Sequence, residues 1–219
     1  MHRAVIEGDG KLMNVTSKLA AAMAVCLTLA GCAGSGPPPP TYGDAFKGLF
    51  NQSSASVPAD AQVTVQQPLG IIFSDNVETW FDYVKRTNAY WATVVPSSLT
   101  NTVVLADTDP NFVGGRVLAM LKRRFPNSEY VKDFGQAVAS GKKGAIVVDV
   151  LPNPMQPYGD RTTKFDISLY FFDARMNPVS RMSGHGERYV PMGAGDAGIQ
   201  AAVDGAVSQL ETKVDALVR

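Results

Sequence analysis

The stretch that decides the fold is residues 165–190, FDISLYFFDARMNPVSRMSGHGERYV. Its first part places apolar side chains at every second position: Phe165, Ile167, Leu169 and Phe171. A period of two is typical of a half-buried β-strand. Residues 173–178 predict a turn, and residues 179–190 return as the second strand of a hairpin. Gly184 and Gly186 carry no side chain on that strand, which predicts a bulge or the close approach of another backbone.

A long amphipathic helix is predicted after the hairpin, over residues 196–218. Its apolar residues recur at i, i+4, i+7, i+11, i+15 and i+18: Ile199, Val203, Ala206, Leu210, Val214 and Leu217. A helix of this length is about 34 Å long. The spacing gathers the apolar side chains in one stripe, which we expect to pack on the sheet.

Upstream of the hairpin, predicted strands alternate with predicted helices. The strands are residues 69–73, 102–106 and 145–151, and the helices run from Ser74 or Asp75 to Pro96 and from Asp109 to Phe125. Two interpretations of the next segment stay open: a short helix around Phe134 that ends at Gly141, or a strand at residues 128–132. The order predicts an α/β (α+β) fold, a single sandwich in which helices cover a mixed four- to five-stranded sheet.

An apolar run, LAAAMAVCLTLAGC at residues 19–32, follows Lys18 near the N-terminus. A basic residue, a short apolar core and small residues at the end are typical of a secretory signal. A membrane-spanning helix would need about 20 apolar residues. Acidic residues such as Glu7 are unusual at the start of a signal, so we expect translation to begin at Met13 and exclude residues 1–12 from the fold.

Residues 29–32, LAGC, resemble the lipobox of bacterial lipoproteins. The resemblance implies that Cys32 receives a diacylglycerol thioether, that the chain is cut before it, and that its new amino group is acylated, as with palmitate. Ala33 stands where an aspartate would imply retention at the inner membrane. The resemblance therefore implies an outer-membrane lipoprotein with its domain facing the periplasm, and several acyl chains would make the attachment stable.

Three segments follow from this organisation. Residues 1–31 are the signal peptide, residues 32–62 are a lipidated cysteine with a Gly/Ser/Pro tether, and residues 63–219 are the periplasmic domain. The four prolines at residues 37–40 predict an extended spacer of about 12 Å. We expect this spacer to hold the domain away from the membrane.

The composition excludes several functions. Lys+Arg and Asp+Glu number 20 each, so the formal net charge is zero and a nucleic-acid partner is not expected. The two cysteines, Cys26 and Cys32, leave no thiol pair after processing, which excludes a disulfide or a Cys-ligated metal in the mature chain. His185 and Glu187 form a surface polar pair rather than an acid–base site. We expect no catalytic residue, metal or cofactor.

Aromatic and flexible apolar residues indicate a candidate partner surface. Trp80, Tyr83 and Trp91 belong to one predicted helix, where the core cannot take every aromatic side chain. Met155 and Tyr158 lie in a proline-rich loop. Exposed aromatic area of this kind is typical of protein-binding sites.

The order of motifs resembles a family of periplasmic domains. The motifs are LGIIF, LKRRF, AVASGKKGAIVVDV, the hairpin and the terminal helix, over residues 68–218. They resemble the TolB N-terminal, CsgG and LpoB-like α/β domains, although Lys143-Gly144 and Asn177-Pro178 depart from the usual pattern. The resemblance implies the fold by analogy, and for CsgG also self-assembly into a ring. It transfers no site residue beyond Cys32.

These observations predict a non-enzymatic accessory or docking subunit of a periplasmic machine, for cell-wall synthesis, secretion or transport. Its partners would be the membrane, through the N-terminal lipid, and an envelope protein. The alternative is a carrier of a small ligand or lipid, which would need an apolar cavity between the sheet and the helices.

Overall fold

The computed structural model describes residues 37–43, 46, 65–94, 110–153, 161–191 and 197–217. The chain consists of two compact units, Met1–Pro38 and Pro39–Arg219. Only residues 37 and 38 of the first unit are described, so the following account concerns the second. None of the described helices is long and apolar enough to cross a membrane.

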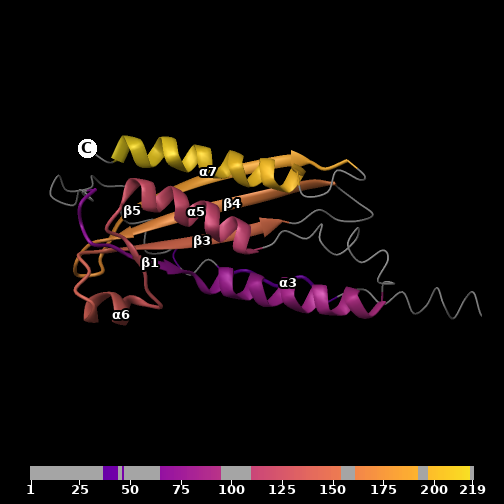
Figure 1. Ribbon diagram of the computed structural model, residues 1–219, viewed down its shortest axis with the longest axis horizontal. Helices are drawn as coiled ribbons and strands as arrows, with labels where there is room; N and C mark the ends of the chain where they lie inside the picture. Colours follow the sequence, from indigo (N-terminus) through magenta and orange to yellow (C-terminus); the bar gives the residue numbers. More distant parts are fainter. Residues whose placement is uncertain are drawn as a thin grey trace, which may run out of the picture. The chain divides into compact units, whose positions relative to one another are not determined.

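The second unit is a mixed five-stranded sheet with helices (Figure 1). The elements in chain order are β1 (Gly70–Phe73), α3 (Asp75–Val94), α5 (Pro110–Arg124), β2 (Glu129–Tyr130), α6 (Phe134–Ala139), β3 (Ala145–Asn153), β4 (Thr162–Phe172), β5 (Pro178–Tyr189) and α7 (Ala197–Leu217). The strand order is β2-β1-β3-β4-β5, in which β1 is parallel to both neighbours and the β3–β4–β5 pairs are antiparallel. The predicted fold class, hairpin and terminal helix are confirmed.

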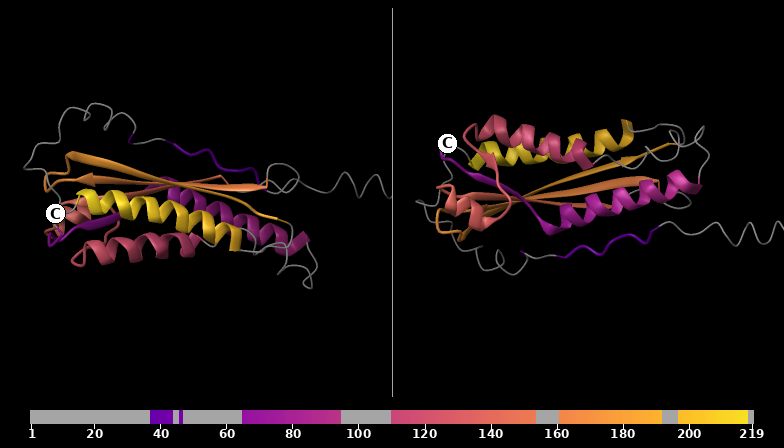
Figure 2. Two further views of the ribbon diagram at one scale, coloured as in Figure 1. Left: turned by 90° about the horizontal axis from the view of Figure 1, so that it is seen from above. Right: turned by 60° about the horizontal axis from the view of Figure 1, so that its bottom comes forward.

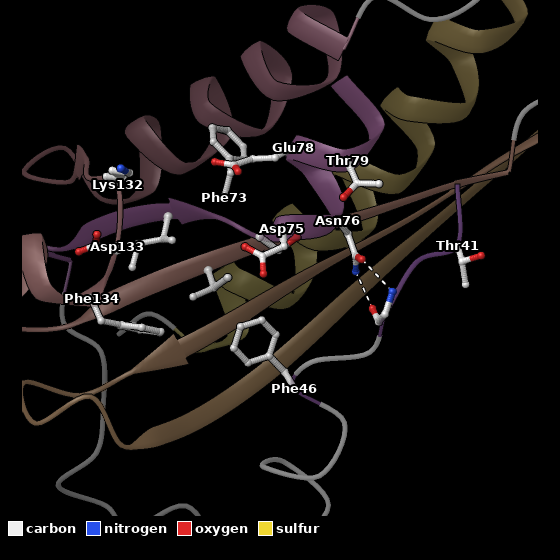
Figure 3. Close-up of a pocket in the computed structure, with 14 residues that line it drawn as sticks. Thr41, Phe46, Phe73, Asp75, Asn76, Glu78, Thr79, Lys132, Asp133 and Phe134 are labelled. Atoms are coloured by element: carbon white, nitrogen blue, oxygen red, sulfur yellow. Dashed lines mark hydrogen bonds between the residues drawn. The ribbon is translucent and has the colours of Figure 1, made fainter. Parts of the chain in front are cut away.

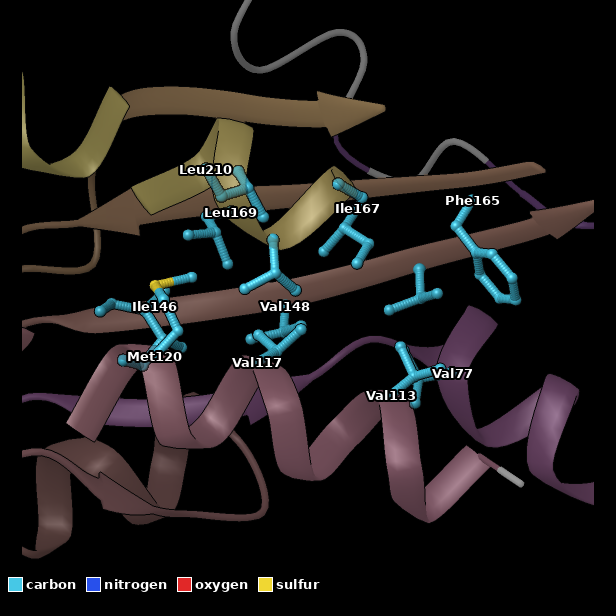
Figure 4. Packing of buried hydrophobic residues seen from close by; sticks show 14 of the residues in the cluster. Val77, Val113, Val117, Met120, Ile146, Val148, Phe165, Ile167, Leu169 and Leu210 are labelled. Atoms are coloured by element: carbon cyan, nitrogen blue, oxygen red, sulfur yellow. The ribbon is translucent and has the colours of Figure 1, made fainter. Parts of the chain in front are cut away.

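The three long helices α3, α5 and α7 cover one face of this sheet (Figure 2). The apolar stripe of α5 is fully buried there: Val113, Val117, Met120 and Leu121. These side chains meet the alternating residues of β4 and the stripe of α7, of which Leu210 is also fully buried (Figure 4). The strand residues that recur with a period of two and the helix residues that recur with a period of 3.6 therefore pack together in one core.

The glycines of β5 let α7 approach the strand closely. A Cβ atom at Gly184 would overlap the carbonyl oxygen of Ala206, and one at Gly186 would overlap that of Ala202. The predicted close approach is thus confirmed, and its partner is the backbone of α7. A larger residue at either position would force the helix away from the sheet.

The opposite face of the sheet has a second, smaller apolar cluster. Tyr170 and Phe172 of β4 are buried there, at 1% and 3% exposure, beneath Phe46 and Phe134. The alternation in β4 correctly predicts which side chains face the helices. The strand is not half-buried over its whole length, because residues distant in sequence cover the other side of its second half.

The sheet edge next to β1 differs from the sequence prediction. The predicted strand at residues 102–106 lies outside the described residues, and β1 pairs at this edge with β2. Both structures left open for residues 128–139 are present, since β2 is a two-residue strand and α6 is a short helix. Asp133 caps α6 by accepting a 2.8 Å hydrogen bond from the backbone N–H of Gln136.

The other edge of the sheet, β5, is partly covered by side chains of α7. The backbone N–H of His185 donates to Oε1 of Gln209 at 3.0 Å. The ammonium group of Lys213 donates to the carbonyl oxygen of Ser183. Two backbone groups that point away from the sheet are therefore already hydrogen-bonded.

Candidate functional site

The proline-rich tether packs onto the domain. Pro39, Pro40 and Tyr42 line a small cavity of about 330 Å³ together with Trp80 and Tyr83 of α3. Tyr42 and Tyr83 both pack against the main core cluster. Residues 39–43, named here the docked segment, thus belong to the domain, although the sequence places its start near Val63. The predicted start of the domain at residue 63 is not tested directly, because the structure does not describe residues 47–64.

Burial in this cavity changes the acidity of a tyrosine. Burial of the phenol raises the pKa of Tyr42 to about 12, and the electrostatic effect of Tyr83 is a smaller cause in the same direction. Both effects disfavour the phenolate, and the larger one is burial, because a charged oxygen loses solvation in a partly apolar site.

The structure corrects part of the predicted partner surface. Trp80 is buried, at 4% exposure, and its ring lies 6.0 Å from that of Phe165, between centroids. It lies on the core stripe of α3 with Val77 and Val84, three and four residues away, so it cannot contact a partner. Tyr83 is partly buried beside the docked segment.

The remaining predicted site residues are not tested by the structure. Trp91 lies in α3, but its side chain is outside the described part of the molecule. Cys32, Met155 and Tyr158 also lie outside the described residues. Their roles stay predictions.

A single asparagine holds the end of the docked segment. The backbone N–H of Gly43 donates to Oδ1 of Asn76 at 2.9 Å, and Nδ2 of Asn76 donates to the carbonyl oxygen of Gly43 at 2.7 Å (Figure 3). This pair satisfies both backbone groups of one residue, as a neighbouring strand would. The docked segment therefore pairs with a side chain rather than with the sheet.

A buried carboxylate orients that asparagine. Asp149 of β3 is only 5% exposed, and its Oδ1 accepts from Nδ2 of Asn76 at 3.0 Å and from Oγ of Ser74 at 2.5 Å. A carboxylate only accepts, so it fixes the amide of Asn76 with its nitrogen inward. Ser74 directly precedes α3, and its hydroxyl is used here rather than as a helix cap. The sequence reasoning missed this network, because its members lie in different elements.

A groove of about 530 Å³ lies beside this network, at the carboxyl ends of β1 and β2. We name it the strand-end groove. It is lined by residues of the docked segment, by Phe46, and by residues of β1, β3, the start of α3 and the start of α6: Thr41, Gly43, Phe46, Ile72, Phe73, Ser74, Asp75, Asn76, Glu78, Thr79, Lys132, Asp133, Phe134 and Val147 (Figure 3). No periodic pattern of residues indicates this groove.

The position of this groove follows from the topology. The loop after β1 leads to α3 on the helix-covered face, whereas the loop after β2 leads to α6 on the other face. Adjacent parallel strands whose loops separate in this way form the usual ligand crevice of open α/β sheets. Its acidic residues also have local roles, since Asp75 and Glu78 lie in the first turn of α3 and Asp133 caps α6.

The groove lies elsewhere than the apolar cavity that the sequence analysis expects of a carrier. That cavity would lie between the sheet and the helices, but fully buried side chains such as Val117, Ile146 and Leu169 meet there. The strand-end groove and the cavity at the docked segment lie instead at the margin of the sheet.

The polar cluster around His185 lies on the face opposite the long helices. Its Nδ1 is 2.7 Å from Oδ1 of Asp166, and its Nε2 is 3.5 Å from Oε2 of Glu187. The hydrogen bond to Asp166 is the main cause that raises the pKa of His185 above its ordinary value. Both ring nitrogens are therefore engaged by carboxylates. Within the described residues, no group of three potential ligands could hold a metal ion.

Comparisons with known proteins give little further information. No family model matches the sequence, and no curated protein is similar to it. Two solved dodecamers of PelC from Paraburkholderia phytofirmans are similar in structure. The first, in space group C2, is 8% identical with a TM-score of 0.40, covering 73% of this chain and 95% of that chain. The second, in space group P6, is 7% identical with a TM-score of 0.40, covering 72% and 92%. Scores at this level are too low to indicate a shared function or assembly.

Proposed function

We propose that the chain is a lipid-anchored lipoprotein of the bacterial outer membrane, and that it acts as a non-enzymatic accessory subunit of a periplasmic machine. The observation that carries the proposal is the sequence LAGC at residues 29–32, after a short apolar run and a basic residue. Acylation of Cys32 would attach the domain to the membrane through residues 33–38. Self-assembly of the subunit belongs to the same proposal.

The chemistry of the described surface supports a binding role over catalysis. His185 is half exposed, its Nδ1 pairs with Asp166 at 2.7 Å, and its Nε2 lies 3.5 Å from Glu187, so both ring nitrogens have a carboxylate partner within the domain. The buried Asp149 is likewise committed to Ser74 and Asn76. These contacts give each group a structural role, which supports the proposal.

The anchor is tested first. Cells that express the tagged chain are labelled with radioactive palmitate, and the label should appear on the protein and in the outer-membrane fraction. Cys32→Ser should lose both, whereas Cys26→Ser, which changes the signal alone, should keep both. Label-free protein that is released into the soluble periplasm would contradict the proposal.

The accessory role needs a second experiment. In-cell crosslinking of the lipidated protein, followed by mass spectrometry, should capture one envelope protein repeatedly, and Cys32→Ser should lose that product. Capture of the chain itself alone would favour self-assembly. Hydrolase activity that disappears in His185→Ala would refute the non-enzymatic role.

A second candidate function is that of a small-ligand carrier, and the strand-end groove favours it. The groove has a volume suited to a small molecule and lies where open α/β sheets usually bind ligands. Native mass spectrometry of protein purified from its own cells would show a bound molecule. Phe134→Ala, which removes one aromatic wall, should weaken its binding, and Tyr189→Ala, an exposed aromatic residue elsewhere, should not.

A further inference from the structure

We propose that the C-terminal half of α3 lies against the surface of an anionic phospholipid bilayer. The inference rests on the proposed lipid attachment at Cys32, and it names which end of the domain meets the membrane. It also reverses the expectation from the sequence that the proline-rich tether holds the domain at a distance.

The first step is the length of free chain. Pro39 and Pro40 line one cavity with Trp80 and Tyr83, and the adjacent Tyr42 and Gly43 pack on the core and bond to Asn76, so the tether ends where the docked segment begins. Seven residue steps separate Cys32 from Pro39, and a fully extended chain of that length spans about 25 Å. The acylated cysteine lies in the interface, so this part of the domain must lie within that distance of the membrane.

The second step is the direction of the docked segment. Gly43 pairs with Asn76 near the start of α3, and Pro39 and Pro40 lie beside Tyr83, two turns further along the helix. The segment therefore runs antiparallel to α3. Followed towards Cys32, it leads to the C-terminal half of the helix, from Tyr83 to Val94.

The third step is the position of the opposite end of the domain. Figure 1 shows α6 at one end of the sheet and the last turns of α3 at the other. Strand β4 between them has 11 residues, which is about 36 Å of extended chain. A tether that starts beside Tyr83 can bring the end of α3 to the bilayer, whereas α6 would point away from it.

The fourth step is charge complementarity. Lys85 and Arg86 are exposed, and no acidic residue follows Asp82 in the helix. The backbone carbonyl oxygen of Asp82 accepts a 3.3 Å hydrogen bond from Nε of Arg86. Within the described residues neither cation forms a salt bridge. By contrast, three arginines of α5 are paired with acids of α7: Arg116 with Asp204, Arg123 with Glu211 and Arg124 with Asp215.

Unpaired basic residues beside a lipid anchor are attracted to anionic headgroups. Half-exposed Val94, in the last turn of α3, adds apolar surface at the same end. The anchor, the reach of the tether and the charge thus converge on one surface, and the partner that fits it is a membrane.

The test measures which end of the lipidated protein lies near the bilayer. After processing, Cys32 is the only cysteine and is blocked by lipid, so an introduced cysteine is the single free thiol. Ala92→Cys places a fluorophore on the exposed end of α3, and Val138→Cys places one on α6. The protein is reconstituted in vesicles of phosphatidylethanolamine and phosphatidylglycerol that carry an acceptor dye on their headgroups.

We expect strong energy transfer from the label at Ala92 and little from the label at Val138. Adding Lys85→Glu and Arg86→Glu should reduce the transfer from Ala92 to the level of Val138. The matched pair Lys132→Glu and Lys143→Glu, two exposed cations near α6, should not change it. Vesicles of phosphatidylcholine alone should weaken the transfer from Ala92 in the native chain.

Three results would overturn the inference. Equal transfer from both labels, or stronger transfer from Val138, would show a different orientation while leaving the anchor in place. Transfer that is insensitive to the charge reversal would exclude the headgroup contact. Protein that separates from the vesicles altogether would refute the lipid anchor itself, and the proposed function would fail with it.

Discussion

The two faces of the sheet are built in different ways. On one face, α3, α5 and α7 pack on β4 and its neighbours through apolar side chains, and the strand glycines bring α7 against the backbone of β5. On the other face, a shorter helix and single aromatic side chains cover only part of the sheet. The second face also carries the polar groups Asp149, Ser168 and His185.

The two faces contribute differently to the free energy of folding and to the binding of the docked segment. The helix-covered face contains most of the buried apolar area, which is the dominant favourable term in folding. The docked segment lies at the margin of the sheet, where the hydrogen bonds of Asn76 with Gly43 and the packing of Tyr42 against the main core hold it. We therefore expect substitutions on the two faces to differ in size and in what they disturb.

The largest effect is expected where α7 contacts β5. Gly186→Val places a side chain on the carbonyl oxygen of Ala202, so α7 must move and the core beneath it must open. The free energy of unfolding should fall by about 3 kcal/mol or more. Chemical denaturation measures it.

A matched glycine serves as the control for this substitution. Gly115 lies in α5, and a Cβ there would meet nothing within 4 Å. Gly115→Ala should raise the stability by up to about 1 kcal/mol, because alanine favours the helix. If Gly186→Val were as stable as the native chain, the close packing of α7 on β5 would be wrong.

A smaller effect is expected for the buried carboxylate of the other face. Asp149→Ala leaves the hydroxyl of Ser74 and the amide of Asn76 without their acceptor, which should cost about 1–3 kcal/mol. Hydrogen exchange followed by mass spectrometry should also show faster exchange at Gly43. Asp166→Ala removes an exposed carboxylate of the same face and should change the stability by at most about 0.5 kcal/mol.

The docked segment should respond to alkaline pH. The ordinary pKa of tyrosine is 10.0, and that of Tyr42 is about 12. Between these values the unfolded chain releases the phenol proton, whereas the folded chain keeps it. The contribution of Tyr42 to the free energy of unfolding is therefore complete below pH 10 and is lost as the pH rises towards 12.

Ultraviolet absorbance of tyrosinate tests this expectation. The difference between the titration curves of the native chain and Tyr42→Phe should contain one phenol that titrates near pH 12. Tyr189→Phe, at an exposed position, provides the comparison. A difference curve centred near pH 10 would show that the docked segment does not bury Tyr42 in solution.

The smallest effect is expected at His185. Its pKa lies above the ordinary histidine value of 6.5, chiefly because of the hydrogen bond to Asp166. The imidazolium is thus favoured in the folded chain. Its contribution to the free energy of unfolding is complete below pH 6.5 and is lost as the pH rises through the raised pKa. Because the side chain is half exposed, solvent keeps this contribution small.

Proton NMR of the imidazole ring measures this pKa in the processed chain. Asp166→Asn should lower the pKa of His185 towards its ordinary value, whereas Asp204→Asn, in α7 and paired with Arg116, should leave it unchanged. An unchanged pKa in Asp166→Asn would contradict the pairing.

The sequence predicts the helix-covered face well, because its signals are local. Alternation from Phe165 to Phe171 and the stripe from Ile199 to Val214 each report a buried surface within one element. Strand β2 has only two residues, both exposed, so the sequence could only leave a strand at residues 128–132 as one of two alternatives.

The candidate site was largely inaccessible to the same reasoning. Gly43 and Asn76 are 33 residues apart, and neither belongs to a periodic pattern. The aromatic residues of α3 were recognised, but which of them the core would bury depends on Phe165 and on the docked segment. Contacts between segments distant in sequence leave no periodic trace in a single sequence.

Gln209 and Lys213 form hydrogen bonds to the edge of β5, and these bonds limit how two copies of this protein can pair through that strand when they are close together. An open strand edge is a template for another chain, and proteins confined to a surface meet one another often. In this chain, outward-facing backbone groups of Ser183 and His185 are already occupied by its own last helix. Copies of the protein can therefore crowd together without joining their sheets along this part of β5.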